Sequence, residues 1–167
     1  MKNTITTIEK IYSGFPFAHR QHNHDGHCAW IHGHNWTFRL EFSSQTLDAN
    51  GFVVDFGRLQ FIKDFLNDKF DHTLVLNHSD LWLSHLNFSL TDVTPGMDAT
   101  DLAKIVIVPN CGAEGLAEWL LDKLNNLIVE QQNEDYQERG VQVTAVTVME
   151  DEKNSATVRK VYKLQAE

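Results

Sequence analysis

The alternation of apolar and polar residues between His34 and Ser43 constrains the fold of this chain more than any other feature. Single polar residues separate four large apolar ones, namely Trp36, Phe38, Leu40 and Phe42. A period of two places the apolar side chains on one face of a β-strand and the polar ones on the other. The pattern therefore predicts a half-buried strand over residues 34–43, and His34 has the parity of its apolar face.

Weaker patterns predict the other elements and the fold class. Further strands are expected over residues 4–18, 141–150 and 156–164, with Phe15, Phe17 and His19 on one face of the first. After a turn at residues 48–51, residues 52–56 can return as an additional short strand. Apolar residues spaced at i, i+3 and i+4 predict helices over residues 57–70 and 113–130. The order of elements favours an α+β fold, with a four-stranded antiparallel sheet, both helices on one face, and an insertion at about residues 73–110 between the helices.

Composition limits the classes of protein to which the chain can belong. Its 167 residues are 42% hydrophobic, which suits a single domain over residues 1–167. A net charge of -9 disfavours nucleic acid as a partner. Two cysteines make no disulfide framework, and neither a signal peptide nor a membrane-spanning run is recognisable, so a cytoplasmic protein without a membrane partner is expected.

Three histidines near the N-terminus have the spacing of a metal site. His32 and His34 flank a glycine at the start of the predicted strand, and His19 ends the strand before it. If these two strands pair, the three imidazoles meet and leave a fourth coordination position open, as in catalytic zinc sites. Core or surface histidines are the alternative interpretation. His22, His24 and His27 cannot be assigned from composition alone.

Cys28 and several carboxylates are the other candidate functional residues. Cys28 is either a fourth zinc ligand, which would close a structural site, or a working thiol beside a catalytic metal. Asp71-His72, at the end of the predicted helix, could relay a proton or could simply end the helix. Glu150 and Glu114 could bind a nitrogen-rich ring, although Glu114 also suits the first turn of a helix.

These residues together resemble the 6-pyruvoyl-tetrahydropterin synthase family, and most closely its bacterial 6-carboxy-tetrahydropterin synthase branch of queuosine biosynthesis. The resemblance covers nearly the whole chain apart from the insertion, and the three residues between the cysteine and the first histidine of the motif are typical of the bacterial branch. The matching motifs are Phe17-Ala-His19, Cys28-x-x-x-His32-Gly-His34-Asn, Gly51-Phe-Val-Val-Asp-Phe56, Asp71-His72, the segment from Ala113 to Trp119, and Val-x-Val-x-Glu150.

The resemblance implies a fold, a site and a reaction. It implies a tunnelling fold, with trimeric barrels stacked into a homohexamer and active sites at subunit interfaces. Zinc would bind His19, His32 and His34, while Cys28, Asp71 and His72 would form the catalytic set and Glu150 would anchor the pterin. The substrate would be 7,8-dihydroneopterin triphosphate, and the products 6-carboxy-tetrahydropterin, acetaldehyde and triphosphate.

The chain departs from the family pattern before the second helix. Cys111-Gly112 stands where Pro-Thr is usual, so a hydroxyl expected near the pterin is missing and Glu114 is a less certain binder than Glu150. Three alternatives remain open: 6-pyruvoyl-type activity on the same fold, a non-catalytic pterin or purine binder, and a structural zinc module.

Overall fold

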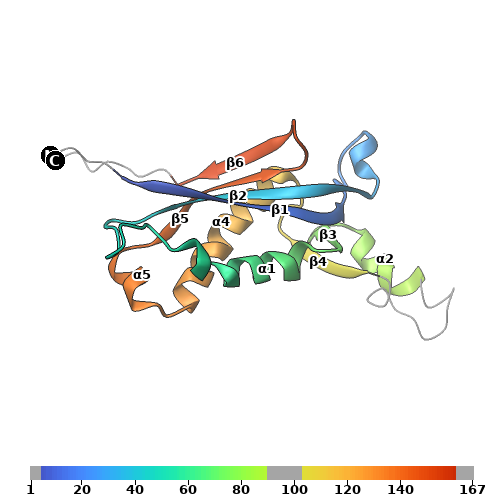
Figure 1. The fold of residues 1–167 in the computed structure, drawn as a ribbon. Helices are drawn as coiled ribbons and strands as arrows, with labels where there is room; N and C mark the ends of the chain where they lie inside the picture. Colours follow the sequence, from blue (N-terminus) through green and yellow to red (C-terminus); the bar gives the residue numbers. More distant parts are fainter. Residues whose placement is uncertain (1–4, 90–102, 161–167) are drawn as a thin grey trace, which may run out of the picture.

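The molecule is a curved sheet with helices on one side. The computed structural model describes residues 5–89 and 103–160, and the statements below concern these residues. The helices α1 (Gln60–Phe70) and α4 (Ala113–Glu130) lie on the same side of the sheet (Figure 1). The predicted α+β class and the placement of both helices on one face are therefore confirmed.

The sheet has six strands and is mixed, whereas the sequence predicted four antiparallel strands. Its order is β4-β3-β1-β2-β5-β6. Neighbours among β1, β2, β5 and β6 pair antiparallel, while β3 runs parallel to both β1 and β4. The strand bounds are Thr7–His19 for β1, His32–Ser43 for β2, Thr73–Asn77 for β3, Lys104–Val108 for β4, Gln142–Met149 for β5 and Ser155–Arg159 for β6.

The two additional strands come from the segment that the sequence treated as an insertion. This segment also contains α2 (Trp82–Ser89). The apolar run at residues 105–108 lies in β4, which pairs parallel with β3, and together these two strands extend the sheet beyond β1. Residues 90–102 of the insertion, and the end of the strand expected over 156–164, lie outside the described residues.

The strand expected at residues 52–56 does not form. Val53 and Val54 are buried, but their segment leads through a turn into the short 3-10 helix η2 (Phe56–Arg58). Asp55 begins that helix by accepting a hydrogen bond from the Gly57 N–H. Local capping therefore prevails over the apolar pattern.

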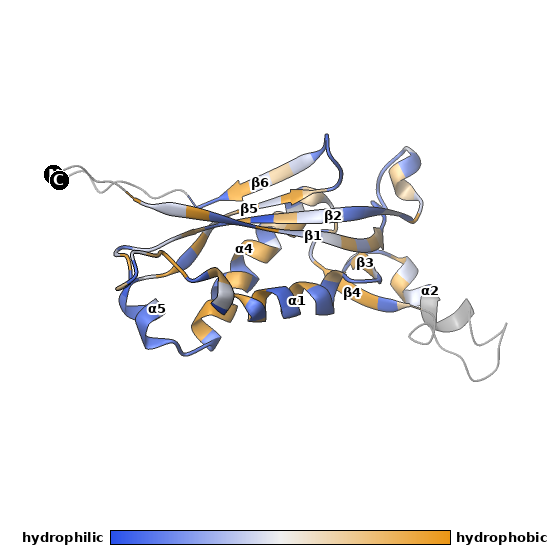
Figure 2. Cartoon of the chain, viewed as in Figure 1, coloured by the Kyte–Doolittle hydropathy of each residue, from blue (hydrophilic) through white to orange (hydrophobic). Residues whose placement is uncertain are grey.

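The core lies between the sheet and the two long helices. All four apolar residues of the alternating stretch in β2 are completely buried, as predicted, and Figure 2 shows hydrophobic and hydrophilic bands alternating along β1 and β2. Phe70, at the end of α1, packs against Phe17, Phe38 and Trp119 at ring-centroid distances of 5.1, 4.8 and 6.2 Å. None of the described helices is long and apolar enough to cross a membrane.

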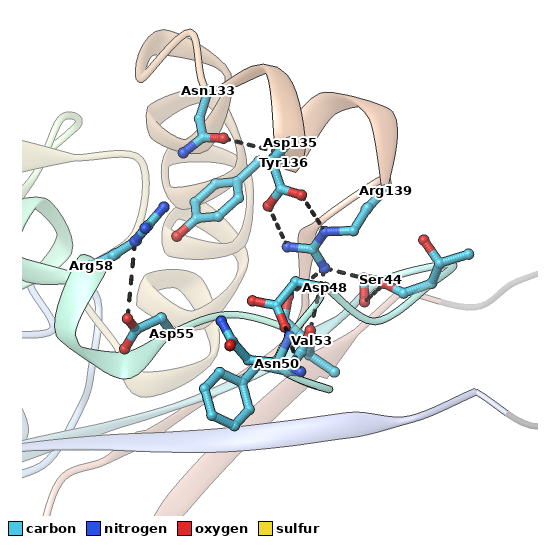
Figure 3. A network of polar contacts seen from close by, with 12 residues as sticks. Ser44, Asp48, Asn50, Val53, Asp55, Arg58, Asn133, Asp135, Tyr136 and Arg139 are labelled. Carbon is cyan, nitrogen blue, oxygen red and sulfur yellow. Dashed lines mark hydrogen bonds and ion pairs between the residues drawn. The ribbon is translucent and has the colours of Figure 1, made fainter.

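A buried arginine, Arg139, links the connection before β5 to the segment after β2 (Figure 3). Arg139 follows the short helix α5 (Glu134–Glu138), and its guanidinium donates to both carboxylate oxygens of Asp135. The same group donates to the carbonyls of Thr46 and Val53. The connection before β5 is thereby joined to the irregular segment that follows β2.

The aromatic packing yields a stability prediction. Phe70→Ala leaves a cavity among three aromatic rings and is expected to lower the free energy of unfolding by about 3–5 kcal/mol, measured by urea denaturation at fixed protein concentration. Val129→Ala, at a side chain that is 64% exposed on α4, is the control and should change it by less than about 0.5 kcal/mol. Equal effects of the two substitutions would contradict this account of the core.

Candidate metal centre and active site

Pairing between β1 and β2 brings the three predicted histidines together. His19 lies directly opposite His32, and Phe17 lies opposite His34. The ring centroids are 4.6 Å apart for His19 and His32, 5.6 Å for His19 and His34, and 5.1 Å for His32 and His34. Gly33 suits the tight pairing between them, because a Cβ there would lie 3.3 Å from the Phe17 carbonyl oxygen.

A β-bulge in β1 turns His19 toward the interior. The register of β1 against β2 shifts between Ser13 and Phe15, at a glycine with φ +86°. Tyr12 is buried before the bulge, and Phe15 and His19 are buried after it, so the inward parity changes at residue 14. Because of the bulge, one strand can bury both Tyr12, before residue 14, and His19, at its end.

Backbone carbonyls orient two of the imidazoles. Nδ1 of His19 donates to the Cys111 carbonyl at 2.9 Å, and Nδ1 of His32 donates to the Trp30 carbonyl at 2.8 Å. These bonds leave Nε2 of each ring as the atom available to a ligand, which is the arrangement found around bound metals. Nε2 of His19 and Nε2 of His34 are both buried and have no hydrogen-bond partner among residues 5–89 and 103–160.

Glu150, at the end of β5, completes the cluster. Its Oε1 lies 3.2 Å from Nε2 of His19 and 3.1 Å from Nε2 of His34, although neither contact has hydrogen-bond geometry. One ligand atom from each of the four residues lies within 4.8 Å of the others. Three imidazoles and a carboxylate are donors that zinc accepts, so the cluster fits a divalent ion. The sequence did not predict the closeness of Glu150 to the histidines.

The other candidate residues near the cluster line one open cavity of about 360 Å³. Cys28, which is half-buried in the short 3-10 helix η1 (His27–Ala29), faces it together with His32, Glu114 and Glu150. The cavity also has lining residues that the sequence did not single out or left unassigned: Gln21, His24, Gly112, Ala113, Lys153, Asn154 and Ser155. The sequence signals among these were the departure from the family pattern at Gly112, the start of a matching segment at Ala113, and the unassigned His24.

Asp71 and His72 do not line this cavity. They connect α1 to β3, and Asp71 accepts a hydrogen bond of 2.6 Å from Nδ1 of His72. Their side chains are 49% and 82% exposed. His72 has a φ of 55°, which is uncommon for a residue with a side chain, and its N–H donates to the Pro16 carbonyl. The pair is preorganised, but it faces solvent in a single copy of the chain.

Burial sets the protonation of the groups behind the site. Burial lowers the pKa of His19, and the hydrogen bond to the Cys111 carbonyl opposes this effect in part. The neutral imidazole that a metal requires is therefore favoured. Burial raises the pKa of the Cys111 thiol, whose Sγ donates to the Arg20 carbonyl. Cys111 is thus a packing residue, and Cys28 is the thiol that faces the cavity.

Curated relatives match part of the chain. A 6-carboxy-5,6,7,8-tetrahydropterin synthase from Rickettsia bellii is 33% identical over 67 residues, which cover 40% of this chain and 49% of the relative. The Bacillus subtilis enzyme of the same name is 36% identical over 55 residues, covering 33% of this chain and 36% of the relative. The match thus spans about half the length of these relatives, or less.

Solved structures share the whole fold. An uncharacterized protein from Wolinella succinogenes has a TM-score of 0.76 at 23% identity, with 95% of this chain and 100% of that chain covered. A catalytic-residue mutant of 6-pyruvoyltetrahydropterin synthase from Plasmodium vivax has a TM-score of 0.61 at 22% identity, with 93% and 98% covered. At these identities the likeness concerns the fold alone.

The family assignment rests on a longer match. Residues 7–161 match the family described as 6-pyruvoyl tetrahydropterin synthase. This range includes every strand and helix described above and all the residues around the cavity. The chain therefore belongs to the 6-pyruvoyl tetrahydropterin synthase family.

Proposed function

We propose that this protein is a zinc-dependent lyase that converts 7,8-dihydroneopterin triphosphate into 6-carboxy-5,6,7,8-tetrahydropterin, with release of acetaldehyde and triphosphate. The observation that carries the proposal is the convergence of three imidazoles beside a cavity that is lined by a thiol and two carboxylates, in a chain of this family. A structural zinc module would need no such cavity. A non-catalytic binder would need no thiol beside the cluster.

The 6-carboxy reaction is favoured over the 6-pyruvoyl reaction by two features. The matching curated relatives from Rickettsia bellii and Bacillus subtilis carry the 6-carboxy name. The three residues between Cys28 and His32 resemble the spacing of the bacterial branch. The 6-pyruvoyl-type activity remains the second candidate because structures that bear that name share the fold.

The metal would be held by His19, His32 and His34. A zinc ion there would polarise oxygens of the substrate side chain and acidify the neighbouring C–H bonds. The carbonyls of Cys111 and Trp30 fix the orientation of two of the ligands, so that little rearrangement is needed on binding. We assign Glu150 to the substrate, because three imidazoles already suffice for an open catalytic site and its carboxylate also faces the cavity.

The remaining cavity residues would move protons and hold the ring. Cys28 would take a proton from the substrate side chain as its thiolate. Glu150 would accept two hydrogen bonds from the amino group and ring N–H of the pterin, a pairing that fixes its orientation. Glu114, in the first turn of α4, is placed to assist at the same cavity.

Asp71 and His72 would act on the site of a neighbouring copy. Within one chain the pair lies outside the cavity and is exposed. The carboxylate orients the imidazole and leaves its Nε2 to accept or donate a proton. A homo-oligomer, for which the resemblance suggests a hexamer, would bring this pair to the cavity beside Cys28 of another copy.

Turnover tests the proposed reaction directly. Incubation of the purified, zinc-loaded protein with 7,8-dihydroneopterin triphosphate should yield 6-carboxy-tetrahydropterin and acetaldehyde, identified by mass spectrometry. A 6-pyruvoyl product would establish the second candidate instead. No consumption of the substrate would overturn the proposed function while leaving the family and the fold in place.

Zinc content separates the metal ligands from their neighbours. His32→Ala should lose both bound zinc and turnover, because it removes one of the three ligands. Cys28→Ala should retain zinc and lose at least about 100-fold in kcat, as expected for removal of a general base. Glu150→Gln should also retain zinc while KM rises. Elemental analysis gives the metal content, and zinc loss in Cys28→Ala or Glu150→Gln equal to that in His32→Ala would make the affected residue a ligand.

Mixed oligomers test the origin of the proton relay. Cys28→Ala and His72→Ala should each be inactive alone, but co-expressed copies should regain activity, because some sites combine an intact Cys28 from one copy with an intact His72 from another. Cys28→Ala mixed with Cys28→Ser, which supplies no intact thiol, is the matched control. If the first mixture is as inactive as the control, the pair serves its own chain.

A further inference from the structure

Two segments pack side by side behind the cavity. Residues 19–21 run from the last residue of β1 into the loop after it, and Cys111-Gly112 precedes α4. The Cys111 carbonyl accepts from His19 Nδ1 at 2.9 Å, and Cys111 Sγ donates to the Arg20 carbonyl at 3.0 Å. The third contact is between Gln21 and Gly112, where a Cβ built on the glycine would fall 2.5 Å from Nε2 and 3.6 Å from Cδ of Gln21. The carboxamide of Gln21 therefore occupies the space that a side chain at position 112 would need.

The backbone at Gly112 does not itself require glycine. Its φ of -77° and ψ of 165° are ordinary extended values, and it is the N-cap residue of α4. N-cap positions favour Ser, Thr, Asn and Asp, whose side chains satisfy the first helical N–H groups. Gly112 provides no such oxygen, and its own N–H is bonded to Asn110 Oδ1. The evident consequence of the glycine is room for the Gln21 side chain.

Gln21 is fixed at its backbone while its side chain remains available. Its N–H donates to the Cys28 carbonyl at 2.8 Å, and its carbonyl accepts from the His24 N–H at 2.9 Å. Within residues 5–89 and 103–160, the carboxamide makes no hydrogen bond that meets normal geometry. Gln21 and Gly112 both line the cavity that holds Cys28 and Glu150. The side-chain amide of Gln21 therefore lies at the cavity wall, available to a ligand, in the loop that also carries Cys28.

The chemistry of the amide complements that of the two carboxylates. Ionised Glu114 and Glu150 can only accept hydrogen bonds, so they can bind N–H groups of a ring but not its carbonyl oxygen. A carboxamide offers a donor and an acceptor side by side. Because Glu150 takes the ring N–H in the proposed pose, the N–H donor of the Gln21 amide is left for the adjacent ring carbonyl oxygen.

We propose that Gln21 is a substrate-positioning residue that donates a hydrogen bond to the ring carbonyl oxygen of the pterin, in the space that Gly112 leaves open. This inference rests on the proposed function, because it takes the cavity to bind a pterin. In this proposal Gln21, in the loop after β1, supplies the polar group that a side chain at position 112 would otherwise provide.

The test compares Gln21→Met with the wild-type protein, both zinc-loaded and given 7,8-dihydroneopterin triphosphate. Methionine keeps the length and volume of glutamine but cannot donate this hydrogen bond. KM should rise roughly three- to tenfold, the loss of about one net hydrogen bond, while kcat, zinc content and the thermal midpoint stay near the wild-type values. A purely packing role predicts a normal KM for this variant.

Gly112→Thr tests the shared space. The threonine displaces the Gln21 side chain, so KM should rise as in Gln21→Met. Combining Gly112→Thr with Gln21→Ala should raise KM no further than Gln21→Ala alone, because both changes remove the same contact. Additive increases in KM would show that the two substitutions do not act on the same contact.

The outcomes separate this inference from the proposed function. A wild-type KM in Gln21→Met, or a fall in zinc content and thermal midpoint together with kcat, would overturn the role of Gln21 while leaving the reaction intact. If the wild-type protein neither binds nor converts the pterin, the proposed function fails, and the inference fails with it.

Discussion

The antiparallel register between β1 and β2 is the constraint on which the site depends. It sets His19 opposite His32 and Phe17 opposite His34, and a shift by one residue would turn the inward side chains of a strand outward. The register is stabilised by the buried aromatic residues of both strands, including the stacked pair Phe17 and Trp36 at 4.6 Å. Core packing and metal-site geometry are therefore two results of the same pairing.

The sheet alone does not complete the centre. The segment before α4 supplies the carbonyl that orients His19, and the end of β5 supplies Glu150. The loop after β1 carries Cys28 to the same cavity. Four separate parts of the chain thus converge, and backbone carbonyls orient two of the imidazoles, those of His19 and His32. This arrangement suits a site that must keep one coordination position free for substrate.

The sequence predicted those features that depend on local periodicity. The strand through Trp36, the helix from Ala113 to Glu130 and the meeting of the three histidines follow from repeats of two or 3.6 residues and from strand pairing. It did not predict the parallel pairing of β3 with β4, the 3-10 helix at residues 56–58, or the contact between Gln21 and Gly112. These depend on residues far apart in the chain, or on capping that overrides an apolar run.

X-ray absorption spectroscopy at the zinc edge of the zinc-loaded wild-type protein tests the central claim most directly. An open three-histidine centre with Cys28 beside it predicts a first shell of nitrogen and oxygen only, at about 2.0–2.1 Å, with the multiple scattering of imidazole rings. A sulfur scatterer at about 2.3 Å would make Cys28 a ligand and contradict the account.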